Sequence, residues 1–335
     1  MNKITSSSKS VAPIRPNHDA ERTVRELLIA RFFDDLRFRG WFFCISELTA
    51  PWSLQLPGGR LSALHVVLEG ECVLGILGDS DQTLTLKVGD IGLLPRDDIH
   101  IVADQPGRKA VPVAEIPEID RRDRNTTSFR YGGGGKRTLL LTASFVAEYG
   151  APEAMLAGLP ALVVLHAASK ACLPIEPVLQ LIRSEASLKS DTSAAVLRRS
   201  AEILFVQVLR EVLQTTRVES GWIAAASDPR LASVLAVMHA HPDRNWTLAE
   251  LSERVHLSRS AFFERFTACM GITPKEYLGD LRLKLAIRSL RDTTSSVARI
   301  AMSIGYDSPS AFARAFRRAT GQSPNQFRDQ YQYKN

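Results

Sequence analysis

The side chains of this sequence best suited to chemistry are hydroxyl and basic residues that recur in two short segments near its C-terminal end. Ser258 and Arg259 lie in the first segment, and Ser308 and Arg314 lie in the second. Serine hydroxyls cap helix N-termini, and arginine side chains bind phosphates and the edges of guanine bases. The chemistry that these residues predict is noncovalent recognition of nucleic acid.

A second candidate group consists of His65, Glu69 and His100, which are the residue types of a two-histidine, one-carboxylate metal site. The alternative is structural, with His65 a hydrogen-bonded histidine inside a β-domain and His100 a turn residue. Because a second histidine is missing from the first segment, we expect no metal and no cofactor. The four cysteines form no CxxC pair, which is typical of a protein in a reducing cytosol.

The basic and hydroxyl residues belong to an internal repeat of about fifty residues. Copy one spans Thr247 to Leu278, and copy two spans Ser296 to Arg328. Aligning the copies pairs four phenylalanines, two glycines and two prolines, and the offset between them grows from 49 to 50 residues at the turn. Copy two is therefore predicted to have one extra turn residue, near Tyr306 and Asp307.

Each copy carries the start and stop signals of a short helix, a tight turn and a second helix. Thr247 and Glu250 form a capping box, and Ser258 or Ser308 can cap the second helix. Pro309 occupies a first helical position, where its missing N–H costs nothing. A single copy would be compatible with an ordinary helical hairpin, but the duplication favours two helix-turn-helix units.

The helix between the two copies sets their spacing. About 17 residues at a rise of 1.5 Å span about 26 Å, which would place two recognition helices about one DNA turn, or 34 Å, apart. The charge distribution agrees with this expectation. Residues 1–221 hold 26 basic and 26 acidic residues, whereas residues 222–335 hold 16 and 10, so the net charge of +6 lies in the C-terminal third.

The preceding part of the chain is predicted to be a β-domain. Residues 1–22 are expected to be a disordered arm, followed by a short helix from Thr23 to Phe33. Short β-rich runs then recur about every ten residues without intervening helices, which is typical of an antiparallel barrel or sandwich. We expect these runs at 42–48, 63–68, 72–77, 83–88, 91–94, 99–102, 138–145 and 161–166, with a flexible stretch at 121–137.

Residues 167–221 are predicted to be a helical linker. Residues 178–187 and 195–213 both show helical periodicity, and the second helix is apolar on more than one side. We expect it to pack on the β-domain and to form the seam of a homodimer.

The C-terminal third resembles the AraC/XylS family of bacterial regulators over residues 222–330. The matching motifs are LSRSAFFERF, GITPKEYL and IAMSIGYDSPSAFARAFRRATGQSPNQFR. The resemblance implies base contacts from Ser260, Phe263, Glu264, Ser310 and Arg314, and phosphate contacts from Arg259, Arg265, Lys275, Arg317 and Arg318. Glu264 stands where many relatives have arginine. In the alternative interpretation, Arg265 reads the base and Glu264 is an ordinary solvated residue.

The N-terminal part, residues 23–166, is similar to the cupin-type sensor of AraC-like proteins. The similarity rests on the segment from His65 to Gly70 and on the segment from Gly89 and Asp90 through Pro95 to His100. It implies a small-molecule pocket inside the domain. We predict that Trp52, Arg60, His65 and Glu69 line that pocket.

Together these observations predict an α+β multidomain protein, with a cupin-like antiparallel β-barrel, a helical linker and dimerisation segment, and an all-α double helix-turn-helix domain. The predicted function is a ligand-responsive transcriptional regulator in the cytoplasm. Its partners would be double-stranded promoter DNA, a small-molecule effector, a second copy of the chain and RNA polymerase, with no membrane. Two alternatives remain: a metal-dependent cupin enzyme, either an oxygenase or an isomerase, with an accessory DNA module, and a helical interaction module without DNA affinity.

Overall fold

The computed structural model describes residues 24–30, 33, 38–58, 62–78, 83–96, 98–116, 128–147, 156, 158–169, 174–188, 191–216, 218 and 220–332. The predicted arm at 1–22 lies outside the described residues, and so does Arg60. Helical backbone is present at 24–30, within the range predicted for the first helix. None of the helices described here has the length and apolar composition that crossing a bilayer requires.

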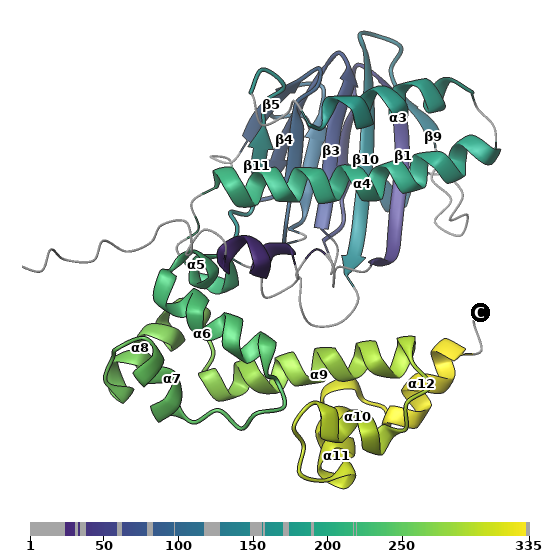
Figure 1. Ribbon diagram of the computed structural model, residues 1–335. Coiled ribbons are helices and arrows are strands. Elements are labelled where there is room, and N and C mark those ends of the chain that lie inside the picture. Colours follow the sequence, from purple (N-terminus) through teal and green to yellow (C-terminus); the bar gives the residue numbers. More distant parts are fainter. Residues whose placement is uncertain are drawn as a thin grey trace, which may run out of the picture.

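Within the described ranges of the N-terminal half, eleven strands form two sheets, which are drawn in Figure 1. The six-stranded sheet has the order β11-β6-β3-β10-β1-β9. Its strands are β1 (Phe38–Thr49), β3 (Ser62–Glu69), β6 (Ile91–Leu94), β9 (Ser128–Gly132), β10 (Arg137–Ala147) and β11 (Val163–Leu165). β3 and β1 flank β10 in antiparallel register, with His65 opposite Thr142. This pairing brings residues that are 77 positions apart in the sequence to the same place.

The five-stranded sheet has the order β5-β4-β7-β2-β8. It contains β2 (Ser53–Leu56), β4 (Glu71–Ile76), β5 (Thr83–Lys87), β7 (His100–Ala103) and β8 (Val111–Pro112), followed by the short helix η2 (Val113–Glu115). Apolar side chains from both sheets form one core cluster, which includes Leu48, Val67, Leu74 and Val102. The two sheets therefore pack face to face.

The β-rich domain predicted from the strand spacing is confirmed, with two differences from the expected antiparallel barrel. Among the described residues the sheets do not close into one barrel, and two strand pairs, β1 with β9 and β2 with β8, are parallel. The prediction of a flexible stretch at 121–137 was wrong in its second half, because β9 lies there and pairs with the end of β1. β2, β8 and β9 are short strands whose pairing partners are distant in sequence, so local patterns did not reveal them.

Helices α3 (Glu176–Leu188) and α4 (Asp191–Thr215) lie side by side across the outer face of the six-stranded sheet (Figure 1). The rings of Phe145 on β10 and Phe205 on α4 are 4.4 Å apart between centroids. The buried side of α4 carries Leu197, Leu204, Val208 and Val212, as the helical periodicity predicted. Burial of this stripe fixes α4 on the sheet.

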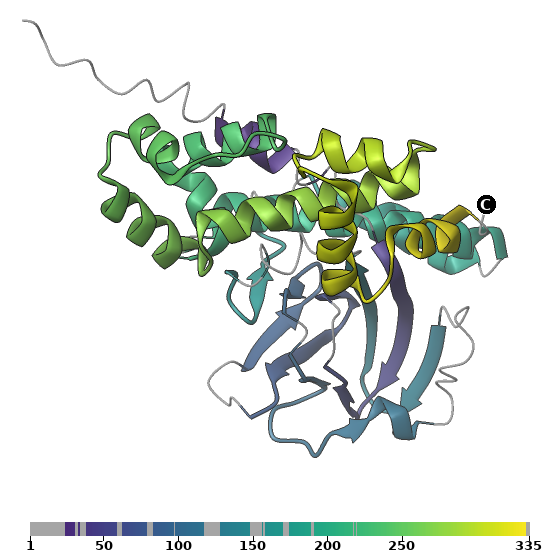
Figure 2. The same cartoon turned by 90° about the horizontal axis from the view of Figure 1, so that it is seen from below.

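Eight helices follow: α5 (Gly221–Ser227), α6 (Pro229–Ala240), α7 (Leu248–Arg254), α8 (Arg259–Met270), α9 (Pro274–Asp292), α10 (Val297–Ser303), α11 (Pro309–Thr320) and α12 (Pro324–Gln332). The long helix α9 runs between a group formed by α5 to α8 and a group formed by α10 to α12 (Figures 1 and 2). The predicted extra turn residue is present, because four residues (255–258) separate α7 from α8 and five (304–308) separate α10 from α11.

The hydrophobic core divides at α9. One cluster is continuous from the outer face of the six-stranded sheet through α4 and α5 to α8, and it includes Tyr277, Leu278 and Leu281 from the first half of α9. A separate cluster holds α10, α11 and α12 together around Ala286, Ile287 and Leu290 from the second half. The first helix-turn-helix unit thus shares its core with the N-terminal domain, whereas the second unit has its own.

Candidate DNA-binding site

The first helix-turn-helix unit is built as its capping residues predict. Thr247 and Glu250 form a reciprocal capping box at the start of α7, in which the Thr247 hydroxyl accepts a hydrogen bond from the Glu250 backbone N–H at 3.2 Å. In return, the Thr247 backbone N–H and hydroxyl donate to the Glu250 carboxylate at 2.8 Å, and these two bonds, with a further one from Arg244, lower the pKa of that carboxyl to about 2. Ser258 caps α8 by accepting from Ala261 N–H, and Gly271 ends α8 in the left-handed conformation.

The second unit repeats this construction. Ser308 accepts from the backbone N–H of Ala311, Pro309 is the first residue of α11, and Gly321 ends the helix in the left-handed conformation. In each unit two phenylalanines at i and i+4 are fully buried: Phe262 and Phe266 in α8, and Phe312 and Phe316 in α11. Their burial fixes which face of α8 and of α11 is directed outward.

All five predicted base-contact residues lie on these outward faces. Ser260, Phe263 and Glu264 are exposed on α8, and Ser310 and Arg314 are exposed on α11. Phe263 is 40% exposed although it is a large apolar residue, and such a ring can contact a thymine methyl group. The structure thus brings the predicted readers together in two groups, one on each recognition helix.

The predicted phosphate-contact residues differ in whether they already form an ion pair within the protein. Arg259, Lys275, Arg317 and Arg318 are exposed, and no carboxylate of the described part of the chain forms an ion pair with them. Arg265 instead donates two hydrogen bonds to Oδ2 of Asp228, the N-cap of α6. Its charge is therefore already compensated within the protein, although both Arg265 and Glu264 are exposed.

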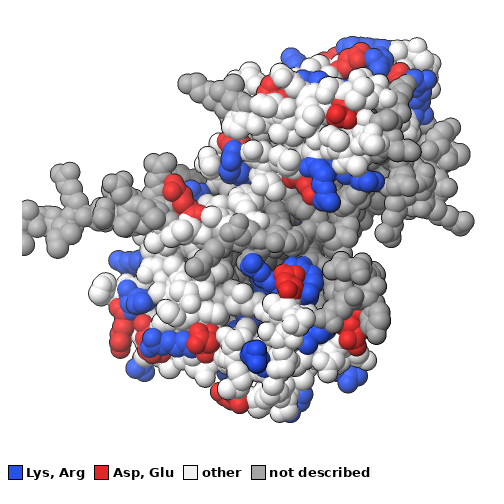
Figure 3. Space-filling view, turned by 45° about the vertical axis from the view of Figure 1, so that its right-hand side comes forward, with Lys and Arg blue, Asp and Glu red and all other residues white. Residues whose placement is uncertain are grey.

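The face shown in Figure 3 carries blue Lys and Arg side chains interspersed with red Asp and Glu side chains on both lobes. Among the described residues of this view, no continuous single-sign patch extends over the face.

A separate pair of polar side chains lies inside the β-domain, where His65 and His100 form a hydrogen bond between the two sheets. Their Nε2 atoms are 2.8 Å apart, and both side chains are buried. His100 Nδ1 is 2.9 Å from the Asp98 carbonyl oxygen, so this nitrogen must donate and Nε2 must accept. His65 Nε2 is then the donor, and its Nδ1 accepts from the Thr142 hydroxyl at 3.0 Å.

This hydrogen-bond chain satisfies both neutral imidazoles and explains the histidines structurally. Glu69, the third member of the predicted metal group, is 51% exposed and accepts a hydrogen bond from Arg137 at 2.7 Å. The three side chains do not converge, and among the described residues no group of three His, Cys, Asp or Glu is arranged to hold a metal ion. The site that the enzyme hypothesis requires is therefore not formed by these residues.

The histidine pair predicts a pH dependence of stability. Burial lowers the pKa of His65 well below its ordinary value of 6.5, with the neighbouring His100 adding to the shift, and burial also lowers the pKa of His100. The unfolded chain then binds more protons than the folded chain below about pH 6.5, so stability falls as the pH drops below that value. Urea unfolding at several pH values should show this slope. His65→Gln should flatten it, whereas His241→Gln, at an exposed position, should not.

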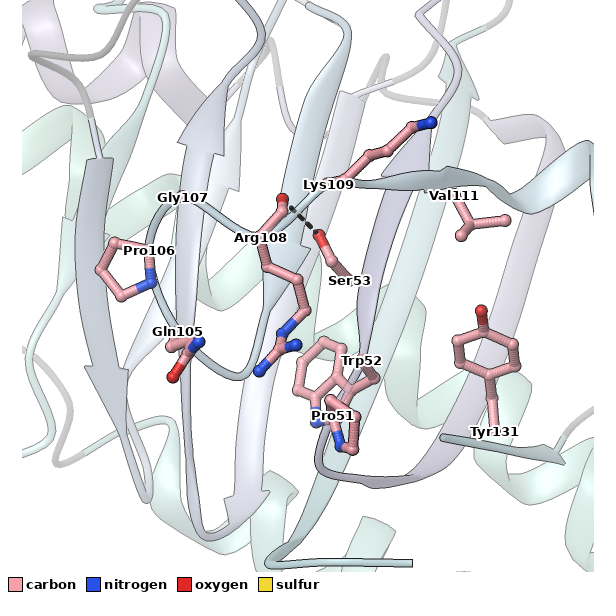
Figure 4. Close-up of a pocket in the computed structure, with 10 residues that line it drawn as sticks. All are labelled: Pro51, Trp52, Ser53, Gln105, Pro106, Gly107, Arg108, Lys109, Val111 and Tyr131. Atoms are coloured by element: carbon pink, nitrogen blue, oxygen red, sulfur yellow. Dashed lines mark hydrogen bonds between the residues drawn. The ribbon is translucent and has the colours of Figure 1, made fainter. Parts of the chain in front are cut away.

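A cavity of about 560 Å³ opens at the rim of the β-domain (Figure 4). Its wall includes Trp52 after the β1–β2 turn, Arg108 and Lys109 from the loop between β7 and β8, and Tyr131 on β9. The Trp52 indole N–H is buried and has no hydrogen-bond acceptor within the described ranges. A volume of this size lies within the range of small-molecule sites.

Of the three predicted effector-site residues that the structure describes, one lines this cavity. Trp52 does, but His65 is engaged with His100, and Glu69 lies at the end of β3 with Arg137. The structure does not bring these three residues into one site. Sequence reasoning missed Arg108 and Lys109, which lie in a turn with Gly107 and carry no periodic signal. It also missed Asp228 and Arg282, which act through contacts with distant parts of the chain.

Comparison with known proteins agrees with the two-part architecture. Residues 28–214, more than half of the chain, match the family described as Cupin, and residues 251–330 match the family described as Helix-turn-helix domain. A putative AraC-like transcription regulator of Streptomyces lividans is 31% identical over 278 residues, which cover 83% of this chain and 90% of that protein.

Two of the other similar proteins illustrate the two parts of the chain. The HTH-type transcriptional regulator AlkR of Acinetobacter baylyi is 26% identical over 90% of this chain and 99% of its own length. The DNA-binding domain of AdpA, solved in complex with a target DNA, is 32% identical over 31% of this chain and 94% of that chain, with a TM-score of 0.30. With this full-length similarity and both family matches, the chain belongs to the AraC-like regulators and is a DNA-binding transcription regulator with a cupin-type N-terminal domain.

Proposed function

We propose that α8 and α11 enter successive major grooves of one promoter DNA, so that a single chain reads two adjacent half-sites. The supporting observation is that both helices bury their phenylalanine pair and direct the opposite, polar face outward. α9 separates them with 19 residues, about 28 Å at 1.5 Å per residue, a length comparable to one turn of DNA.

Within each groove we assign different tasks to the outward residues. Ser260, Phe263, Glu264, Ser310 and Arg314 contact base edges, with Arg314 binding guanine O6 and N7 and Glu264 accepting from a cytosine amine. Arg259, Lys275, Arg317 and Arg318 contact phosphates and hold the register. Arg265 joins them only if its bonds to Asp228 open.

Hydroxyl-radical footprinting of the full chain on its promoter tests this proposal. Two protected segments should appear on one face of the duplex, with their centres about 10 base pairs apart. Arg314→Ala should weaken protection at the half-site bound by α11 more than at the half-site bound by α8. A single protected segment of about 5 base pairs would contradict reading by both helices.

We further propose that the regulator responds to a small molecule in the cavity beside Trp52. Lys109 is exposed at its wall, and Arg108 is paired with Asp104 at 2.5 Å, so one cationic group is available for an anionic or hydrogen-bond-accepting ligand.

Thermal-shift measurements with a set of small organic carboxylates test the cavity. A ligand at 100 times its Kd should stabilise the protein by about 2.7 kcal/mol. Tyr131→Ala and Lys109→Ala should remove this effect, whereas Lys87→Ala, on a strand that does not line the cavity, should retain it. Stabilising ligands that are insensitive to both cavity substitutions would place the effector site elsewhere.

The outer side of the helical linker supports the proposal of a homodimer. Leu181, Leu188, Val196 and Ile203 are 42%, 62%, 37% and 51% exposed, and they lie seven residues apart on α3 and on α4. Apolar residues at this spacing are typical of a helix–helix seam. Dimerisation, RNA polymerase as a partner, a cytoplasmic location and the domain boundaries at 166 and 221 remain predictions from the sequence.

A further inference from the structure

A single arginine in α9 ties the two helix-turn-helix units together. Arg282 donates from Nε to the Pro242 carbonyl oxygen at 2.7 Å, and from Nη2 to the carbonyl oxygens of Asp243 and Arg244 at 3.3 and 3.1 Å. Nη2 also lies 3.0 Å from the side-chain oxygen of Asn245. These four acceptors belong to the loop between α6 and α7, so Arg282 fastens the middle of α9 to the first unit.

The turn of the second unit packs directly against this loop. Gly305, between α10 and α11, has a φ of +83°, and a Cβ atom there would overlap the Asp243 carbonyl oxygen. The same Cβ would lie 2.6 Å from Nη2 of Arg282. The backbone of the second unit therefore touches both the loop of the first unit and the guanidinium that holds it. We call Arg282, residues 242–245 and Gly305 the inter-unit clamp.

The internal repeat shows that the turn itself does not require glycine. His256 occupies the equivalent position of the first unit, 49 residues earlier, and adopts the same left-handed conformation with a φ of 53°. His256 is exposed, so its side chain has room. Gly305 is needed because the first unit lies against it. At the equivalent turn of the first unit, where the side chain of His256 is exposed, a residue with a side chain is tolerated.

The clamp lies where the hydrophobic core is interrupted. Leu281 belongs to the cluster of the first unit, and Ala286 belongs to the cluster of the second. Arg282 follows Leu281 directly, so at the junction its polar contacts stand beside the half-buried Leu285, which packs against both clusters. Such contacts are directional and define one relative orientation of the two units.

We propose that the inter-unit clamp fixes the angle and separation of α8 and α11, and thereby makes the regulator selective for the spacing of its two half-sites. Arg282 and Gly305 act as positioning residues and do not touch DNA. This inference rests on the proposed reading of successive grooves. One inserted base pair rotates a half-site by about 35° and moves it by about 3.4 Å, which a rigid pair of units cannot follow.

The first test measures the separation of the units without DNA. Spin labels are attached to keto-bearing unnatural residues at Glu253 on α7 and Arg299 on α10, two exposed positions, and their distance distribution is recorded by double electron–electron resonance in the full chain. Gly305→Asn and Arg282→Ala should broaden or shift the distribution. Asparagine tolerates the left-handed conformation, so Gly305→Asn chiefly adds the steric overlap.

Gly321→Asn is the matched control. Gly321 has a φ of +78°, close to that of Gly305, but a Cβ there would meet no atom within 4 Å. This variant carries the same backbone cost in the same unit and should leave the distance distribution unchanged. Arg282→Lys should not rescue the clamp, because an ammonium group cannot reproduce the planar fork. Identical distributions for wild type, Gly305→Asn and Arg282→Ala would overturn the inference.

The second test compares affinities for the footprinted promoter site and for the same site with one base pair inserted between its halves. The inserted base pair should lower the affinity of the wild type about tenfold or more, which is within the range of affinity lost through one mismatched base pair. The Gly305→Asn and Arg282→Ala variants should bind the native site more weakly than the wild type does. For each variant, the affinities for the native and the lengthened site should differ by less than about threefold. A wild type indifferent to spacing would refute successive-groove reading, whereas undiminished discrimination in both variants would refute only the clamp.

Discussion

Replacing Phe316 with alanine is expected to unfold the second helix-turn-helix unit and to leave the first unit folded. Phe316 is fully buried, and its ring centroid lies 5.5 Å from that of Phe312 and 5.4 Å from that of Phe327. Removing such a ring costs about 3–5 kcal/mol, which is a large part of the stability of a small unit. This unit has a core cluster of its own, so the loss is not shared with the rest of the molecule.

Hydrogen exchange detected by mass spectrometry measures the outcome. Backbone amides of 297–332 should lose protection, while those of α4 to α8 keep theirs. Phe266→Ala is the matched substitution in the first unit, where the ring lies 5.8 Å from Phe262 and 5.9 Å from Tyr277. Its effect should reach α4 and α5, because that cluster is continuous with them. Equal loss of protection along the whole chain in both variants would contradict two separate cores.

Arg314→Ala is expected to produce the largest loss of sequence-specific binding among the outward residues. Arg314 is exposed on α11 and forms no ion pair with any carboxylate that the structure describes. A bidentate arginine–guanine contact contributes about 1–3 kcal/mol of discrimination, which corresponds to about 5- to 150-fold in affinity. Gel-shift titration should show a reduced preference for the native base and an almost unchanged affinity for unrelated DNA.

Arg317→Ala provides the contrast on the same helix. A phosphate contact releases counterions regardless of sequence, so its loss should weaken binding to all sites and reduce the slope of log K against log salt by about 0.9. The same pattern of loss for Arg314→Ala would reassign Arg314 to the backbone. Full retention of specific binding in both variants would contradict the role of α11 as a recognition helix.

The helix-turn-helix domain could be predicted from the sequence because its signals are local. Thr247, Ser258, Ser308 and Gly321 sit where caps must sit, and the structure shows each of them in that role. The phenylalanine pairs at i and i+4 define the buried side of each recognition helix without knowledge of any partner. Exposure of the predicted readers follows from that burial.

The β-domain was predicted less completely, since strand pairing is a nonlocal property. Alternating apolar runs located β3, β6 and β10, but nothing in the run that contains Phe129 and Tyr131 signals its parallel pairing with β1. Likewise, the effector-site prediction grouped residues by motif and missed the loop of Arg108, which is brought to Trp52 only by the packing of β2 between β7 and β8.

By itself, the sequence determined the repeat, the capped helices within it and the family, because each depends on contacts within a few residues or on a pattern of residue types. Only the tertiary structure decided what depends on distant neighbours: the pairing of His65 with His100, the capture of Arg265 by Asp228, and the contact of Gly305 with Asp243. Partners 35, 37 and 62 residues apart meet through packing, and no local pattern encodes that meeting.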